Sequence, residues 1–191
     1  MTTAAWPPRS SDPAALLAAY TEVLEWPLVT VAGGAGGRVS AAEALRRLAA
    51  DPDTVIGTRC AAAGVDAVVL PLEEGRKALV VLEAHSSLQP DTAPVPAIRT
   101  GDGVMLLVRA GTGGMLAGLE NIRTVTETQL FPLPPTAGVV WDSPPWQPLR
   151  RMPAPFPSGE DLLPALKRAL SPWVAPWPAA APVSCSSKEM L

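Results

Sequence analysis

Residues 97–108 read AIRTGDGVMLLV and are the most informative stretch of the chain. Two apolar runs flank a turn-forming segment, Thr100-Gly101-Asp102-Gly103. Short apolar runs bounded by turn residues are typical of buried strands. An Asp-Gly pair favours a hairpin because glycine accepts the positive φ that such turns need. The stretch therefore predicts a strand, a turn and a strand at the centre of the fold.

Apolar runs of the same kind lie on both sides of this hairpin, at residues 65–75 (VDAVVLPLEEG) and 129–136 (QLFPLPPT). Each is bounded by proline, glycine or polar residues, which favours buried strands over helices. Further strands are expected at residues 28–31, 54–58, 121–125, 129–131 and 138–141, with 121–125 and 129–131 paired to each other.

Helical spacing of apolar residues predicts the helices. The first opens at Pro13, and the second follows the capping-box pattern Ser40-Ala-Ala-Glu43. The second should turn Leu45, Leu48 and Ala49 inward and Arg46 and Arg47 outward. Residues 75–85 favour a helix with a strand as the alternative, and residues 111–119 favour a short helix. Ser158 caps a last helix, although Pro164 favours a later first turn.

These elements predict an α+β fold with an antiparallel or mixed central sheet and flanking helices. We expect a flexible leader at residues 1–12, one domain at 13–170 and a Pro/Ala-rich tail at 171–191. Trp141, Trp146, Trp173 and Trp177 form either an exposed patch or a contact between tail and domain. The tail itself is either a linker or a polyproline ligand for a partner.

Composition narrows the class of protein. The chain has 191 residues, a net charge of −3 and no apolar run long enough to span a membrane. No secretion signal is visible, so we expect a cytoplasmic protein. Basic residues are nearly all arginine, a bias typical of high-GC bacterial genomes. The acidic balance argues against a broad nucleic-acid-binding surface.

Two other features of the sequence are weak candidates for sites. Cys60 and Cys185 have no neighbours that would complete a metal site, and a disulfide between them is not expected. The glycine cluster at residues 33–37 lacks the Gly-Lys-Ser/Thr ending of a phosphate loop. It is interpreted as a flexible connection.

Four segments occur in an order that points to a family: residues 25–29 (EWPLV), 55–74, 99–107 (RTGDGVMLL) and 121–136. Together they resemble the motifs of the primase-polymerase (prim-pol) domain of the archaeo-eukaryotic primase superfamily, the N-terminal domain of bifunctional DNA primase/polymerases. The resemblance covers roughly residues 16–148. It implies a two-lobed prim-pol fold and nucleotidyl transfer by two divalent ions, Mg²⁺ or Mn²⁺, held by carboxylates.

The residues that would carry this chemistry differ here. The family's first metal-binding aspartate falls on Pro71, the second on Glu73 and the third on Asn121, and its histidine falls on Leu106. Arg123 and the Pro-Pro corner at 134–135 match the motif. The lone histidine, His85, and the two aspartates Asp66 and Asp102 are the candidates for replacement roles. One retained carboxylate cannot hold two divalent ions, so the resemblance predicts that the polymerase chemistry is lost.

The sequence therefore favours a catalytically inactive prim-pol-like domain that binds a protein partner and needs no cofactor. One alternative is an active primase/polymerase-type nucleotidyl transferase, with Mg²⁺ or Mn²⁺ near Glu73, Asn121 and Asp102. Another is a DNA-binding accessory protein. Arg99, Thr100 and Arg123 are the candidates for contact with nucleotide or DNA, and the accessory role would also use Arg46, Arg47 and Arg109.

Overall fold

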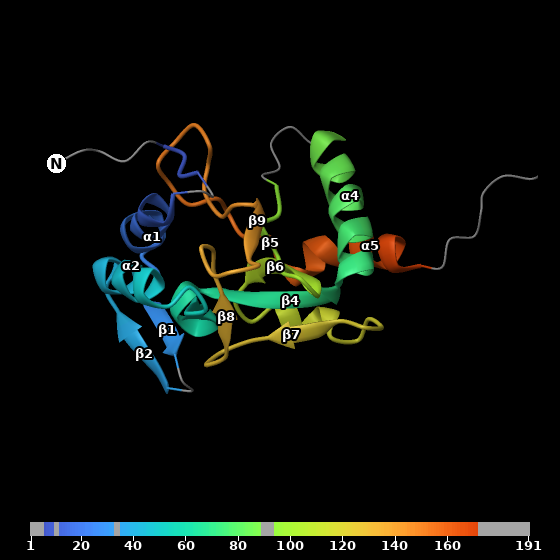
Figure 1. Ribbon diagram of the computed structural model, residues 1–191. Coiled ribbons are helices and arrows are strands. Elements are labelled where there is room, and N and C mark those ends of the chain that lie inside the picture. The colour runs from blue at the N-terminus through green and yellow to red at the C-terminus, as the bar shows by residue number, and fades with distance from the viewer. Residues whose placement is uncertain (1–5, 10–11, 33–34, 89–93, 172–191) are drawn as a thin grey trace, which may run out of the picture.

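The fold is built from two antiparallel sheets with helices packed on them (Figure 1). The computed structural model describes residues 6–9, 12–32, 35–88 and 94–171. The α+β class predicted from the sequence is confirmed, and all strand pairs in the two sheets of the described residues are antiparallel. None of the helices in these residues is long and apolar enough to cross a membrane.

Sheet A has four strands in the order β2-β1-β3-β8. They are β1 (Leu28–Ala32), β2 (Ala35–Val39), β3 (Val55–Arg59) and β8 (Leu130–Pro132). Helices α1 (Pro13–Glu22) and α2 (Ala41–Ala50) lie together on one side of this sheet (Figure 1). Gly36 and Gly37 belong to strand β2, so this part of the glycine cluster is not a flexible connection.

Sheet B has five strands in the order β7-β4-β6-β5-β9. They are β4 (Val65–Pro71), β5 (Ala97–Arg99), β6 (Gly103–Arg109), β7 (Arg123–Val125) and β9 (Val140–Ser143). Helices α4 (Leu72–Leu88) and α5 (Gly159–Leu170) pack on one face of it, next to the 3-10 turn η1 (Gly113–Leu116). The short helix α3 (Cys60–Ala63) links β3 to β4.

The predicted central hairpin is confirmed as β5 and β6, but its turn is closed differently. Neither Gly101 nor Gly103 has a positive φ, so the predicted reason for the Asp-Gly pair is wrong. Thr100 closes the turn instead. Its backbone N–H donates to the Gly103 carbonyl at 2.8 Å, and its hydroxyl accepts from the Gly103 N–H at 3.1 Å.

The expected pairing of residues 121–125 with 129–131 is wrong. Strand β7 pairs with β4 in sheet B, whereas β8 pairs with β3 in sheet A. The turn between them closes by a hydrogen bond from the Gln129 N–H to the Thr126 carbonyl at 3.0 Å. The chain therefore passes from the edge of one sheet to the edge of the other at this turn.

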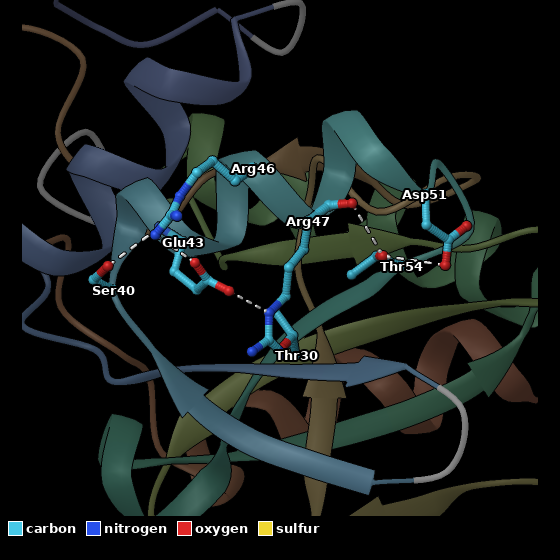
Figure 2. A network of polar contacts seen from close by, with 7 residues as sticks. All are labelled: Thr30, Ser40, Glu43, Arg46, Arg47, Asp51 and Thr54. Atoms are coloured by element: carbon cyan, nitrogen blue, oxygen red, sulfur yellow. Dashed lines mark hydrogen bonds and ion pairs between the residues drawn. The ribbon is translucent and has the colours of Figure 1, made fainter.

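Helix α2 is rotated relative to the prediction. Ala44 is buried and Leu48 half-buried, but Leu45 and Ala49 are exposed. Arg47 does not point outward. Its guanidinium donates to the hydroxyl of the buried Thr30 on β1 at 2.7 Å and to Glu43 at 2.8 Å (Figure 2). Glu43 also forms an ion pair with Arg46 at 2.5 Å. The two arginines together hold its carboxylate on the helix surface.

The structure settles two other helix predictions. Residues 75–85 are helical, within α4, which excludes the strand alternative. Gly75 lies so close to β6 that a Cβ there would be 2.5 Å from Val104. Helix α5 begins directly after Ser158, and Pro164 lies inside it. A complete capping box between Ser158 and Asp161 fixes that start, so Pro164 does not delay the first turn.

The core has two parts, one on each face of sheet B. The first lies between sheet B, sheet A and α1, and it contains an aromatic cluster of Tyr20, Trp26, Trp141 and Trp146. Trp146 is buried and Trp141 half-buried, so the exposed-patch alternative is wrong for these two. Trp173 and Trp177 lie outside the described residues. The second part lies under α4 and α5.

One residue of the expected leader takes part in this packing. The Trp6 ring lies 5.9 Å from that of Trp146, and its Nε1 donates to the Gln147 carbonyl at 3.2 Å.

Candidate functional site

A cavity of about 470 Å³ lies where the two sheets meet, and we call it the cleft. One wall is the face of sheet B that carries Val69, Met105 and Val125, and the other is strand β8. Its rim is formed by the β5–β6 turn and by the segment that enters β7. The cleft thus joins segments that are up to about 60 residues apart in the chain, from Val69 to Pro132.

The polar groups of the cleft come from its rim. Thr100 and Asp102 lie on the β5–β6 turn, and the Thr100 hydroxyl is 2.8 Å from a carboxylate oxygen of Asp102. Asn121 has a positive φ of 62°, a conformation that asparagine adopts more readily than most residues. Arg123, at the start of β7, is exposed and makes no ion pair within the described residues. Gln129 completes the polar lining.

Three of the five positions taken from the family motifs line the cleft: Pro71, Asn121 and Arg123. Glu73 does not. It lies exposed in the first turn of α4, where its carboxylate is 3.2 Å from Arg76. Glu73, the one carboxylate among these five predicted positions, is therefore not among the lining residues of the cleft.

Leu106 lies on the opposite face of sheet B. It is buried in the core under α4 and α5, in register with Val68 of β4. Met105 lines the cleft instead. Alternation along β6 is the sequence signal that separates these two neighbours, because successive side chains of a strand point to opposite faces.

The other candidate ligands also lie away from the cleft. Asp66 is buried on the far face of sheet B, and its carboxylate accepts from the Gly113 N–H at 2.9 Å. The side chain of His85 lies outside the described residues. Asp102 is thus the acidic side chain that the described residues contribute to the cleft. Within these residues, no three His, Cys, Asp or Glu side chains form a group that could hold a metal ion.

The candidate arginines do not form one surface patch. Arg46 and Arg47 pair with Glu43 on α2, and Arg99 pairs with Asp142 on β9 at 3.5 Å. Arg109 is exposed at the end of β6. Of the three nucleotide-binding candidates, Thr100 and Arg123 line the cleft and Arg99 does not.

Sequence reasoning missed the apolar half of the cleft. Met105, Leu130 and Pro132 were expected only as strand or core residues, yet they line the cavity beside Arg123. Only the pairing of β8 with sheet A brings Leu130 and Pro132 there.

In comparisons with known proteins, no family model, no curated protein and no solved structure matches this chain.

Proposed function

We propose that this chain is a prim-pol-like domain without nucleotidyl-transferase chemistry that acts by binding a protein partner. The observation that carries the proposal is the chemistry of the cleft. In the resemblance, Pro71 and Asn121 fall on the family's metal-binding aspartates, and both residues line the cavity. A pyrrolidine ring and a neutral amide cannot supply the charged oxygens that two divalent ions need.

The arrangement of the motif segments supports the family part of the proposal. Pro71, Thr100, Asn121 and Arg123 come from separate strands and turns of sheet B, yet they line one cavity. A site that has lost its charged ligands while its walls persist is expected when a fold is kept for binding.

The composition of the cleft supports binding over catalysis. Asp102 is hydrogen-bonded to Thr100, and Arg123 is the one cation of the lining within the described residues. A cleft with apolar walls and a few polar groups at its rim suits a docked side chain or peptide.

The first experiment is a thermal-shift titration with nucleoside triphosphates, with and without Mn²⁺, together with an assay of nucleotide incorporation. A ligand that binds only the folded state raises the melting temperature. We expect neither a Mn²⁺-dependent rise nor incorporation by the wild-type chain. Incorporation that is lost in Glu73→Gln would overturn the proposal and establish the transferase.

A matched variant shows that the assay can detect a working metal site. Pro71→Asp combined with Asn121→Asp returns carboxylates to two of the motif positions. We expect this double variant to gain a Mn²⁺-dependent rise that the wild type lacks. A metal-independent rise with nucleotide, lost in Arg123→Ala, would instead assign the cleft to nucleotide binding and contradict the protein-partner role.

A further inference from the structure

Sheet A has one covered face and one open face, and its strand register tells them apart. Leu28 and Ile56 point into the core, and Thr30 accepts a hydrogen bond from Arg47 of α2 (Figure 2). Val29 and Val31 alternate with these residues along β1 and therefore point to the other side. In the part of the chain that the structure describes, α1 and α2 lie on the first side and no helix lies over the second (Figure 1).

The open face is apolar at its centre. Val29 is in register with Arg38 of β2 and with Gly57 of β3, and Gly57 is in register with Pro132 of β8. These residues make one row across all four strands. Val31 and Val55 form part of the next row.

The side chains on this face pack against one another. Val29 is only 7% exposed, yet it belongs to neither core cluster. A Cβ on Gly57 would be 2.6 Å from the Leu130 side chain, so Leu130 lies flat over the glycine. An antiparallel sheet with one face in water normally presents alternating polar residues there. Here the residues are valine, leucine, proline and glycine. Val31, Val55 and Leu130 are half-buried, so the face keeps accessible apolar surface that a partner would cover.

The charged side chains on the strands of the open face have one sign. Arg38 and Arg59 are the only charged side chains among the described strand residues that the register places on it. Arg38 makes no ion pair with any described residue, while Arg59 donates to the Thr128 carbonyl at 2.7 Å.

We propose that the open face of sheet A binds an acidic polypeptide segment that carries apolar side chains. The apolar centre would take those side chains, and Arg38 and Arg59 would pair with its carboxylates. The inference rests on the proposed function and names the surface and the chemistry of the partner. Leu130 and Pro132 belong both to this face and to the cleft, so a bound segment would continue into the cleft.

The same surface suits a nucleic acid less well. Proteins that bind single strands stack bases on aromatic side chains, and no aromatic side chain lies among the described strand residues of this face.

The test uses selection from a displayed library of random peptides, followed by affinity measurements with the synthetic peptides. Val31→Asp places a carboxylate in the apolar centre, and Arg38→Glu reverses the exposed charge at its edge. Val80→Asp on α4 is the matched control, because Val80 is an exposed apolar residue away from sheet A. Melting temperatures show whether each variant is folded.

We expect the selected peptides to combine acidic and apolar residues. Their affinity should fall at least about tenfold in Val31→Asp and in Arg38→Glu, and stay unchanged in Val80→Asp. Peptides without acidic residues, or affinities that neither sheet A variant changes, would overturn the inference. So would self-association or oligonucleotide binding that Val31→Asp abolishes.

The two proposals fail separately. Mn²⁺-dependent incorporation by the wild type would contradict the proposed function, whatever the peptides do. If the wild type incorporates no nucleotide but the peptides bind to another surface, only the assignment of this face is contradicted.

Discussion

Thr136 holds the backbone of Ile56 from 80 positions along the chain. Its hydroxyl accepts a hydrogen bond from the Ile56 N–H at 2.8 Å and donates one to the Ile56 carbonyl at 3.0 Å. The Leu133 N–H donates to the same carbonyl at 2.8 Å. The segment that follows β8 is thereby fixed to β3 in the buried interior.

Thr136→Val should destabilise the protein by about 1–3 kcal/mol. Valine has nearly the same shape, but it leaves the buried Ile56 N–H without this acceptor, and an unpaired buried donor costs about that much. Chemical denaturation of wild type and variant measures the difference. Thr136→Ser keeps the hydroxyl and is the control. Equal stability of the valine variant and the wild type would contradict this account.

Cys60 should lower the stability of the protein at alkaline pH. Burial raises the pKa of its thiol from 9.0 to about 11, while the thiol donates to the Val125 carbonyl at 3.2 Å. Because the pKa of the thiol is higher in the folded than in the unfolded state, the protonated thiol stabilises the fold. This stabilisation is complete below pH 9.0 and is lost as the pH rises toward about 11.

Denaturation curves across that pH range, for wild type and for Cys60→Ala, measure the effect. The wild type should lose more of its free energy of unfolding than the variant does. Parallel losses in both proteins would show that the thiol is not responsible.

Gly57 should tolerate no side chain. A Cβ there would be 2.5 Å from the Phe131 carbonyl oxygen, in addition to its clash with Leu130. Gly57→Ala must therefore push β8 away from β3, at a cost of about 1–3 kcal/mol. Gly101→Ala is the matched control, because nothing lies within 4 Å of a Cβ at that position. Thermal unfolding should separate the two variants, and equal melting temperatures would contradict the predicted clash.

Local signals predicted the secondary structure well where one interaction dominates. The capping box at Ser158 fixes the start of α5, and the turn-bounded apolar runs give β4, β5 and β6. The strand prediction for residues 65–75 is wrong at its end, because residues 72–75 belong to α4. Prediction failed where contacts between residues distant in the sequence decide which side of an element is buried. The rotation of α2 depends on which residues meet β1, and Arg47 faces the sheet because Thr30 offers it an acceptor.

The candidate site was predictable in part. Pro71, Asn121 and Arg123 were selected from the sequence and do line one cavity. The assignment of Leu106 followed motif spacing, whereas strand alternation places Met105 in the cleft. A shift of one residue changes the face of the sheet, so spacing alone could not settle this position.

The sequence by itself determined strands β4, β5 and β6 and the start of α5, because apolar spacing and caps act over a few residues. It also determined that positions 71 and 121 carry proline and asparagine, which offer no carboxylate. Only the tertiary structure decided that β7 and β8 belong to different sheets, and therefore that a cleft opens between them. Strand pairing depends on contacts between residues far apart in the chain, such as Thr136 with Ile56, and no local pattern records them.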